Sequence, residues 1–425
     1  MLAHKAKNRA RKERKEVDMK KCFILASVLI FSLALVMTAS AAEIKVGTLL
    51  SFTGPLKEFG PGIQNGCILA AKQMGAAGFE VELVKADSET SAIPAVNAAK
   101  KLVDVDKVVA IIGALSSGVT VPVAESVTIP AGVIMISPAS TSPLITVLKA
   151  DQGKDFLFRT CPSDALQGVI AGRFAATYNK TASVLYVNNP YGQGLAQEFK
   201  NSFEKMGGKV LAMVPIDEKA AESYNAELKK VLEGNPDRMC AYSYPEHAKI
   251  YIKEAIEFFK YKHFLFCDGT KSEDIVKAVG AKNVANQFGT APGSAGGEPY
   301  VIFSADYKTE FGKLPPLPFI TNAYDGTAVV GLAAFAAKVK GLPLTSANIR
   351  DNLRYVANPP GENIYPGEFK KAFDLLKDGK DINYEGAAGS VDFDKNGDVT
   401  TPIEVWKYNA KGEIVTVRME YEIPK

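Results

Sequence analysis

The chain has 425 residues, of which 47% are hydrophobic and 23% charged, and its formal net charge is +3. This is ordinary globular composition in a chain long enough for two domains and a sizeable core. Nine of the 50 basic side chains and three of the 47 acidic ones lie in residues 1–21, so the rest carries 41 and 44 and a net charge of −3. That remainder has no block of Lys and Arg with interleaved aromatics, which argues against a nucleic-acid partner.

The N-terminus predicts a leader with a signal peptide over residues 1–42. Residues 1–21 are basic, and residues 22–37 form an apolar run without charge. Ala39 and Ala41 then place small residues before a cleavage site, as is typical of secreted proteins. The basic pI of the whole chain comes from this leader.

Cleavage would leave a mature protein that begins at Ala42 or Glu43. Met19 has the features of a natural start, and residues 1–18 are then either an overlong gene prediction or a long basic segment. The 16 apolar residues fall short of the roughly 20 needed to span a bilayer. No cysteine lies at the cleavage site, so we expect free secretion into a periplasm rather than a membrane anchor or a lipoprotein.

After the leader, strands and helices alternate. The two short β-branched runs at 108–113 and 132–136 predict parallel strands that are buried on both faces. Four strand–helix units in about 110 residues predict a doubly wound parallel sheet. The expected strands are 43–50, 79–86, 108–113 and 132–136, the expected helices are 62–74 and 93–105, and a crossing strand follows at 156–159.

A second α/β series begins at residue 164 and repeats the first architecture. Its expected strands are 183–187, 209–215, 238–244 and 263–267, and its expected helices are 164–178, 191–206, 224–232 and 246–259. Two successive α/β sheets leave a cleft between them, and small ligands commonly bind in such clefts.

The last part of the chain starts with a glycine-rich segment at 289–297, which predicts a second crossing toward the first domain. Helices are expected at 321–340 and 345–356. The end is β-rich, and its Asn-Gly and Lys-Gly pairs predict two hairpins.

Hydroxyl-bearing residues follow both short buried strands. Ser116, Ser117 and Gly118 come after the first, and residues 137–141 after the second. Open α/β sheets bind ligands beyond the carboxyl ends of their strands. Hydroxyls and free backbone N–H groups there suit a carboxylate. The alternative is that these hydroxyls only cap the helices that follow.

Candidate catalytic and metal motifs are weak. Residues 392–397 match the first half of a calcium loop, but Ile403 stands where a bidentate Glu is required, so we expect a hairpin turn. After the leader, His247 and His263 are the only histidines, and no GxSxG elbow or phosphate-binding GxxxxGK[ST] loop is present. We therefore expect no enzymatic activity, no cofactor and no metal.

Cys240 and Cys267 lie in successive predicted strands of the second series. In an oxidising compartment these two cysteines could form a disulfide. Buried free thiols are an equal alternative.

In their order along the chain, the segments GTLLSFTGPLKEFGPGIQNG, ASTSP, YGQGLA and YEGAAGSVDFDKNGD resemble the periplasmic solute-binding proteins of branched-chain amino-acid ABC transporters, which have the type I periplasmic binding fold. The resemblance covers essentially the whole mature chain. It implies two α/β lobes, joined by three hinge crossings, that close on a ligand. The lobes expected are 43–160 with 290–385, and 161–289 with 386–425.

The resemblance also implies how the polar end of an amino acid is bound. Ser117 falls on the serine that holds the α-carboxylate. Ala139 and Thr141, with Ser140 between them, fall on the loop that grips both α-groups. Asp268 takes the position of the acid that pairs with the ammonium, although the leucine-type proteins have Glu there. An alternative role for Asp268 is to cap the helix that begins near Glu273.

Aromatic residues are expected around the side chain of the ligand. Phe59 occupies a position where the leucine-type protein has Tyr, and Tyr191 matches an aromatic of the second lobe. A further tyrosine of the family falls on Ser243, so the residue that faces the cleft is either Tyr242, our choice, or its neighbour Tyr244. Phe59 and Tyr191 could instead be plain core aromatics.

These implications predict a periplasmic monomer that binds a small amino acid, branched-chain or otherwise hydrophobic, and delivers it to the permease subunits of an ABC transporter. The alternative is a ligand-sensing receptor on the same fold that binds an amide, a carboxylate or another small molecule. A secreted α/β hydrolase is a third class, and it would need a nucleophile within reach of His247 or His263.

Overall fold

The computed structural model describes residues 43–421. The predicted leader, residues 1–42, lies outside the described residues, and the signal peptide stays a prediction. The described residues belong to one compact unit. Within residues 43–421 no helix is both long enough and apolar enough to cross a membrane.

The first sheet has five parallel strands in the order β2, β1, β3, β4, β5. Every residue of β3 and β4 is buried. Ile111 and Ile112 of β3 belong to two different apolar clusters, one on each face of the sheet. The prediction of strands buried on both faces is therefore confirmed. The strands are β1 Ile44–Leu50, β2 Val81–Asp87, β3 Ala110–Gly113, β4 Ile134–Ser137 and β5 Leu157–Arg159.

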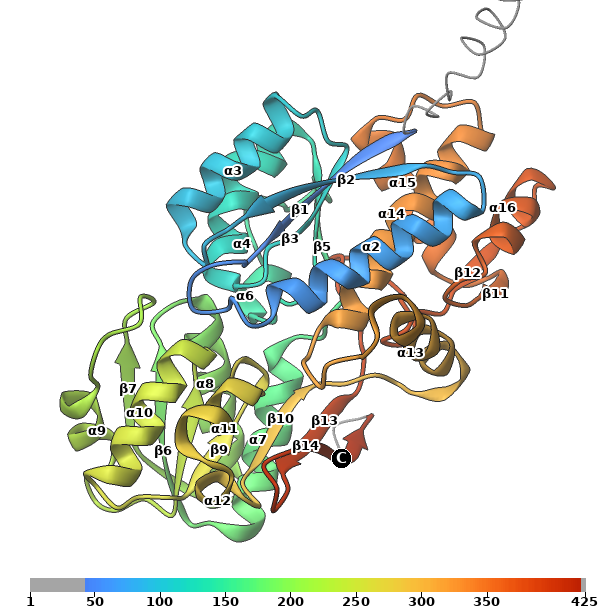
Figure 1. The fold of residues 1–425 in the computed structure, drawn as a ribbon. Coiled ribbons are helices and arrows are strands. Elements are labelled where there is room, and N and C mark those ends of the chain that lie inside the picture. Colours follow the sequence, from blue (N-terminus) through green and yellow to red (C-terminus); the bar gives the residue numbers. More distant parts are fainter. Residues whose placement is uncertain (1–42, 422–425) are drawn as a thin grey trace, which may run out of the picture. The chain divides into compact units, whose positions relative to one another are not determined.

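Helices cover both faces of this sheet (Figure 1). Helices α3 and α4 lie on one face, and α2, α14 and α15 lie on the other. Helix α14 is buried along most of its length because it packs against α2, α15 and the sheet. The helices are α2 Gly60–Ala76, α3 Ala92–Asp104, α4 Ser117–Val123, α5 Ile129–Ala131, α6 Pro143–Thr146, α13 Gly297–Phe311, α14 Ile320–Val339, α15 Ser346–Ala357 and α16 Phe369–Lys377, and a two-stranded sheet consists of β11 Glu362–Ile364 and β12 Ile382–Tyr384.

The second sheet has seven strands in the order β14, β13, β10, β9, β8, β6, β7. Strands β6 to β9 run parallel, as predicted, β10 adds a further parallel strand, and the antiparallel pair β13 and β14 is added at one edge. The strands are β6 Thr181–Val187, β7 Lys209–Ile216, β8 Arg238–Tyr242, β9 Phe264–Phe266, β10 Phe288–Pro292, β13 Ile403–Tyr408 and β14 Ile414–Glu420. The helices are α7 Asp164–Tyr178, α8 Pro190–Lys205, α9 Asn225–Val231, α10 Pro245–Glu257, α11 Glu273–Val279 and α12 Ala281–Val284.

We call the five-stranded sheet, with α2 to α6, α13 to α16 and the small β11–β12 sheet, the first lobe. The seven-stranded sheet with α7 to α12 is the second lobe. The chain passes between them three times: from β5 to α7, from β10 to α13 and from β12 to β13. The segment 289–297, predicted to be a crossing, contributes β10 before the chain crosses. The lobe boundaries given above stay a prediction.

The tail contains one of the two predicted hairpins. Strands β13 and β14 pair around a turn at Asn409, whose side chain accepts hydrogen bonds from the backbone of Lys411 and Glu413. The other prediction is wrong, because no strands flank the turn at 394–398. Asp394 organises that turn by accepting hydrogen bonds from two later N–H groups.

The structure shows free thiols rather than a disulfide between Cys240 and Cys267. Cys67, Cys161, Cys240 and Cys267 are buried free thiols in the part of the chain that is described. Cys267 donates to the carbonyl oxygen of Ala241 at 3.4 Å instead of pairing with Cys240.

Candidate functional site

Two serines cap the short helices that follow β3 and β4. The hydroxyl of Ser116 accepts a hydrogen bond from the N–H of Gly118 at the start of α4. The hydroxyl of Ser142 accepts one from the N–H of Leu144 at the start of α6. The alternative that hydroxyls of these loops cap the following helices is therefore confirmed for Ser116 and Ser142. A ligand can use only the hydrogen-bonding groups of the loops that such contacts leave free.

Hydrogen bonds between the two loops fix their positions. Ser140 Oγ lies 2.7 Å from Thr120 Oγ1 and donates to the carbonyl oxygen of Leu115 at 3.2 Å. Ser117 Oγ accepts from the N–H of Ser142 at 3.2 Å. The hydroxyl of Ser140 is thus used inside the first lobe, whereas the Ser117 hydroxyl keeps its proton for another partner.

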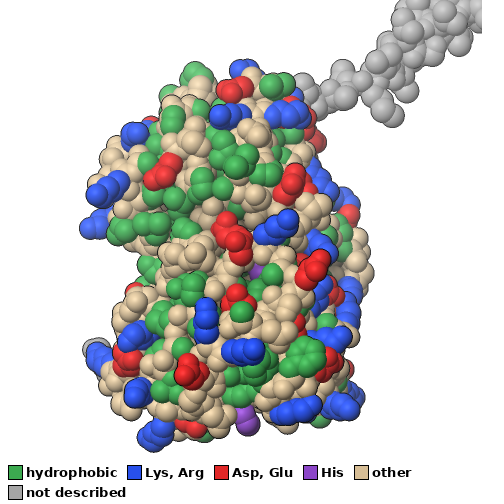
Figure 2. Space-filling model, turned by 90° about the vertical axis from the view of Figure 1, so that its left-hand side faces the viewer, with side chains coloured by type: hydrophobic (Ala, Val, Ile, Leu, Met, Phe, Trp, Pro, Cys, Tyr) green, Lys and Arg blue, Asp and Glu red, His purple; other side chains and the backbone are tan. Residues whose placement is uncertain are grey.

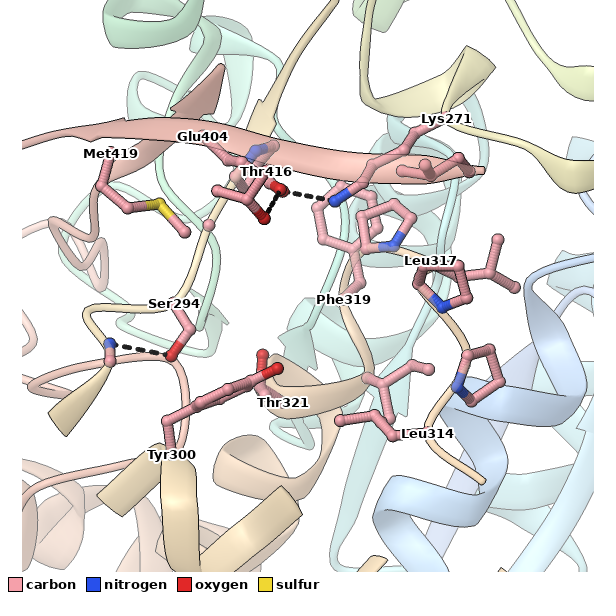
Figure 3. Close-up of a pocket in the computed structure, with 18 residues that line it drawn as sticks. Lys271, Ser294, Tyr300, Leu314, Leu317, Phe319, Thr321, Glu404, Thr416 and Met419 are labelled. Carbon is pink, nitrogen blue, oxygen red and sulfur yellow. Dashed lines mark hydrogen bonds and ion pairs between the residues drawn. The ribbon is translucent and has the colours of Figure 1, made fainter. Parts of the chain in front are cut away.

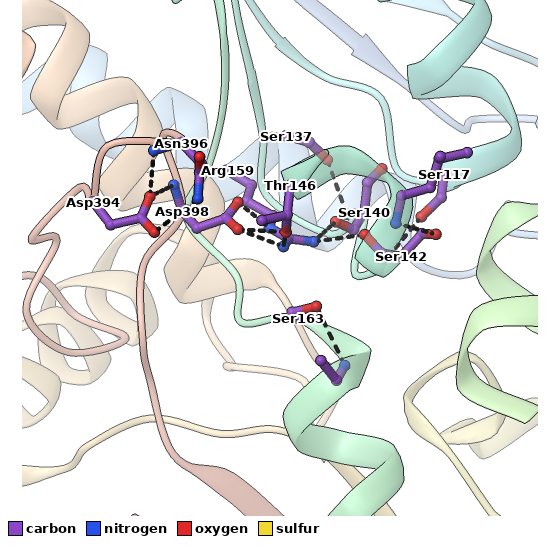
Figure 4. Close-up of polar contacts among 12 residues, drawn as sticks. Ser117, Ser137, Ser140, Ser142, Thr146, Arg159, Ser163, Asp394, Asn396 and Asp398 are labelled. Atoms are coloured by element: carbon purple, nitrogen blue, oxygen red, sulfur yellow. Dashed lines mark hydrogen bonds and ion pairs between the residues drawn. The ribbon is translucent and has the colours of Figure 1, made fainter. Parts of the chain in front are cut away.

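Arg159 of β5 holds the second loop in place (Figure 4). Its guanidinium is fully buried and donates to the carbonyl oxygens of Ser140 and Ser142 at 3.3 and 3.0 Å. It also binds both carboxylate oxygens of Asp398 at 2.7 and 2.9 Å. This two-pronged ion pair connects the loop to the third passage between the lobes.

Asp268 lies directly after β9 in the second lobe and is 3% exposed. Its Oδ1 accepts hydrogen bonds from Gln167 Nε2 at 2.7 Å and from the Tyr191 hydroxyl at 2.9 Å. Ser272, not Asp268, caps the following helix α11. The carboxylate of Asp268 is therefore available for a partner other than a helix terminus.

Tyr244, not Tyr242, belongs to this site. The rings of Tyr191 and Tyr244 stack with their centroids 5.6 Å apart and an interplanar angle of 10°. The hydroxyl of Tyr244 lies 2.8 Å from Ser116 Oγ in the other lobe. Tyr242 instead ends strand β8 and packs edge-on against Phe199 of α8 in the core of the second lobe.

A cavity of about 20 Å³ lies between the lobes at this point, which is room for about one water molecule. Four predicted ligand residues line it together: Phe59, Ala139, Tyr191 and Asp268. The predicted residues Ser117, Ser140, Thr141 and Tyr242 are buried but do not line it. Its other walls are Leu56, Leu115, Ser116, Tyr244, Gly269 and Phe319.

Contacts between the lobes close around the cavity. Besides the bond between Ser116 and Tyr244, Ser142 Oγ donates to the carbonyl oxygen of Pro190 at 2.8 Å. The carboxylate of Glu58 accepts the N–H of Glu273 at 3.0 Å and the hydroxyl of Ser272. These contacts and the small cavity describe a closed arrangement of the two lobes.

Two buried carboxylic acids near the cavity have raised pKa values. Burial raises the pKa of Asp268 to about 6, although the hydrogen bonds from Gln167 and Tyr191 act in the opposite direction. Burial and the charge of Asp268 raise the pKa of Asp164 well above its usual range. Loss of hydration disfavours both carboxylates, and a cation placed between them would restore the ionised forms.

A larger cavity of about 270 Å³ adjoins the second and third passages between the lobes (Figure 3). The buried ion pair between Lys271 and Glu404 forms one wall, and Tyr300 of α13 forms another. Phe319 lines both this cavity and the small one. The two cavities are therefore neighbours that share Phe319 in their linings.

One face of the molecule shows side chains of both charges near an indentation of its outline (Figure 2). On the face in Figure 2, the outline is indented at mid-height, and acidic and basic side chains are interspersed around it. This face gives no support for a polyanionic partner.

His247 has a structural environment. It is fully buried, its Nε2 lies 3.0 Å from the carbonyl oxygen of Glu218, and burial lowers its pKa to about 4. A neutral ring held by a backbone carbonyl gives little support to the hydrolase alternative. Within residues 43–421, no group of three or more His, Cys, Asp or Glu side chains is placed to hold a metal ion.

Several cavity residues were missed by the sequence analysis. Ser116 was named with Ser117 in the loop after the first short strand, but only Ser117 was assigned to the ligand. Gly269 directly follows the predicted Asp268, and the structure shows why a glycine stands there: a Cβ would lie 2.3 Å from the carbonyl oxygen of Ser243. Phe319 gave no signal, because only the fold brings it to the loops near residue 116.

Comparison with known families agrees with this architecture. A family model described as periplasmic binding protein matches residues 43–412. A chemotactic signal transduction system substrate-binding protein of Halobacterium salinarum is 26% identical over 82% of this chain and 83% of its own length. A Leu/Ile/Val-binding protein homolog of Brucella abortus is 31% identical over 59% of this chain and 68% of its own length.

Solved structures show the same fold. A leucine-binding protein of Thermotoga maritima has 25% sequence identity and a TM-score of 0.73, covering 89% of this chain and 98% of that protein. A solute-binding protein of Rhodopseudomonas palustris in complex with benzoate has 17% identity and a TM-score of 0.71, covering 88% and 96%. At that lower identity the likeness concerns the fold alone.

Proposed function

This chain belongs to the periplasmic binding protein family, and we propose that it binds a hydrophobic amino acid between its lobes and delivers it to the permease of an ABC transporter. The family binds solutes rather than converting them, and the resemblance to the branched-chain amino-acid type is confirmed. The choice of ligand and the delivery step are the parts that we propose.

The observation that carries the proposal is the environment of Asp268. This carboxylate lines the cavity, and its hydrogen-bond donors are the neutral groups of Gln167 and Tyr191. Among residues 43–421, no ion pair to Asp268 is formed. A buried carboxylate without a cation is costly, and the α-ammonium of an amino acid supplies one.

The first lobe offers complementary groups for the α-carboxylate. The hydroxyl of Ser117 accepts from a backbone N–H and keeps its proton, so it can donate to a carboxylate. Ser116 and Ala139 line the cavity wall beside it. Thr141 and the backbone of Ala139 are assigned to the ammonium side.

Apolar side chains surround the rest of the cavity. Leu56, Phe59, Leu115 and Phe319 come from the first lobe, and the stacked rings of Tyr191 and Tyr244 come from the second. Burial of a hydrophobic side chain here contributes roughly 25 cal/mol for each Å² of apolar surface removed from water. This composition favours an aliphatic or aromatic side chain over a charged one.

Closure would couple binding to recognition by the permease. Contacts such as Ser116 with Tyr244 and Glu58 with α11 form only when the lobes are together. A ligand that adds contacts to both lobes shifts the population toward this closed form. We propose that the permease recognises that form of a periplasmic monomer.

A receptor role is the second candidate. The Halobacterium relative is named for chemotactic signal transduction, so this chain could pass its closed form to a membrane receptor instead of a permease. Both candidates require the same ligand site, and they differ in the membrane partner.

A thermal-shift screen of the mature protein tests the ligand assignment, because a ligand that binds only the folded state raises the melting temperature. The panel contains the common amino acids, their deaminated acids, amides, sugars and benzoates. We expect shifts with leucine, isoleucine, valine or phenylalanine and none with their deaminated acids. Shifts with benzoate or amides alone would overturn the amino-acid assignment and favour the receptor or aromatic-acid alternatives.

A further inference from the structure

The first turn of α7 joins both parts of the polar site. The N–H of Asp164 donates to the carbonyl oxygen of Thr141 at 2.7 Å, and the Thr141 hydroxyl donates to Asp164 Oδ2 at 2.9 Å. Gln167, three residues later on the same face of the helix, donates to Asp268 at 2.7 Å. One helical turn thereby holds Thr141 from the first lobe and Asp268 from the second.

The bond to Asp164 determines what the Thr141 hydroxyl can do. When a bound cation keeps Asp164 ionised, its carboxylate only accepts hydrogen bonds, so the proton of the Thr141 hydroxyl points to Asp164 and the lone pairs of that hydroxyl face elsewhere. Two further acceptors, Asp164 Oδ1 and Gln167 Oε1, are buried and have no partner among the described residues. With Asp268, this end of the site presents acceptors and negative charge.

The geometry points to Asp164 as a positioning residue that makes Thr141 a hydrogen-bond acceptor, so that the site selects a primary ammonium group over a hydroxyl or a carboxylate. The inference rests on the proposed function and goes beyond it by naming how the amine is told from its closest analogues. An ammonium brings three donors and a positive charge. A hydroxyl brings one donor and no charge, and an added carboxylate meets like charge.

Charge in the surroundings supports this selection. Arg159 is a cation whose charge acts on Asp164, but both carboxylate oxygens of Asp398 already bind its guanidinium. The pKa of Asp164 is raised by burial and by Asp268, so the two acids together disfavour ionisation until a cation arrives. A site built in this way gains more from an ammonium than from any neutral donor.

The test compares an amino acid with its 2-hydroxy acid. Calorimetry measures the Kd of leucine, isoleucine, valine and phenylalanine and of each 2-hydroxy counterpart. For the wild-type protein we expect the best amino acid to bind at least a hundredfold more tightly than its hydroxy acid. In D164N, which keeps the size of the side chain, we expect this ratio to fall at least tenfold, mainly through weaker binding of the amine.

A second variant and a control keep the test decisive. T141V removes the hydroxyl with little change of shape and should lower the same ratio, so the test survives if D164N does not fold. D325N, in α14 of the first lobe, replaces a fully buried acid that accepts the backbone N–H groups of Ala387 and Ala388; it should lower the melting temperature and leave the ratio unchanged.

The role of Asp164 and the proposed function are contradicted by different results. If the wild-type protein binds an amino acid but D164N and T141V keep the wild-type ratio, the role of Asp164 is overturned and the proposed function stands. If the wild-type protein binds none of the amino acids, the proposed function is overturned, and the inference with it.

Discussion

The side-chain oxygens of Ser116 and Tyr244 lie 2.8 Å apart, and their hydrogen bond joins the two lobes at the wall of the small cavity. Ser116 caps α4 in the first lobe, whereas Tyr244 precedes α10 in the second and also accepts from Asn189 at 3.0 Å. The bond between Ser116 and Tyr244 therefore both holds the lobes together and fixes the Tyr244 ring at the cavity wall.

Removal of the Tyr244 hydroxyl should weaken the closed form. A hydrogen bond of this kind contributes about 1 kcal/mol, so we expect Y244F to raise the Kd of the amino acid about fivefold. The matched control is Y242F, because the Tyr242 hydroxyl is buried in the core of the second lobe beside Cys240 of the same strand. Calorimetry on both variants decides the point, and equal effects would contradict the role of Tyr244 in closure.

Substitution of Asp268 should have the largest effect on the amine. D268A removes the counter-charge of a buried ammonium, and we expect affinity to fall by about thirtyfold to several thousandfold, since truncating one partner of a buried charge pair typically costs about 2–5 kcal/mol. D268N tests the same charge with little change of size. A loss below about tenfold in both variants would mean that the ammonium binds elsewhere.

Binding should depend on pH through the same residue. Burial raises the pKa of Asp268 to about 6, and the facing groups Asp164 and Tyr191 also have raised pKa values. Since the ammonium requires an ionised Asp268, affinity should fall by up to about tenfold for each pH unit below about 6. The measurement is calorimetry between pH 4.5 and 8, with D268N expected to show a flatter profile.

Stability of the ligand-free protein should change in the opposite direction. A carboxyl group whose pKa is higher in the folded state holds a proton more tightly there, so its contribution to stability rises as pH falls from about 6 toward 4. Urea unfolding of wild type and D268N over this range measures the difference. A contribution of Asp268 that increases with pH would contradict the assigned burial.

Glu58 should act as a contact specific to the closed form. Its carboxylate accepts the N–H groups of Glu273 and Asp274 at 3.0 and 3.3 Å, at the start of α11 in the opposite lobe. Loss of a cap costs about 1 kcal/mol, so E58A should raise the Kd about fivefold. The control is E82A, since Glu82 is exposed on β2 and pairs only with Lys45 at 3.7 Å among the described residues.

Phe319 should limit the size of the ligand. Because Phe319 lines both the 20 Å³ and the 270 Å³ cavity, F319A should enlarge the space open to the ligand. We expect weaker binding of valine and leucine and relatively stronger binding of phenylalanine and tryptophan, measured as the order of thermal shifts. F319L serves if F319A is unstable, and an unchanged order in the folded variant would contradict this role.

The sheets and the position of Asp268 could be predicted because short β-branched strands are distinctive and ligand loops follow strand ends. The choice between Tyr242 and Tyr244 could not. The predicted strand ran to Tyr244, which would place both tyrosines on one face. Strand β8 instead ends at Tyr242, and the change of direction brings Tyr244 to the cavity.

Two further differences between the sequence-based predictions and the structure, the turn at 396–397 and the role of Ser140, also come from tertiary contacts. The Asn-Gly pair at 396–397 lacks flanking strands because the neighbouring Asp398 pairs with the buried Arg159, a contact across 239 positions that local patterns do not reveal. The hydroxyl of Ser140 was assigned to the ligand, but it bonds to Thr120 inside the lobe. Residue types located the site, and the direction of individual hydroxyls required the structure.

The most direct test of the central claim is a crystal structure of the mature protein with the amino acid that gives the largest thermal shift. We predict that its ammonium nitrogen lies about 3 Å from a carboxylate oxygen of Asp268, with the α-carboxylate at Ser117 and the side chain among Phe59, Tyr191 and Tyr244. An amino acid bound in the 270 Å³ cavity beside Lys271 and Glu404, or with its ammonium away from Asp268, would contradict the account.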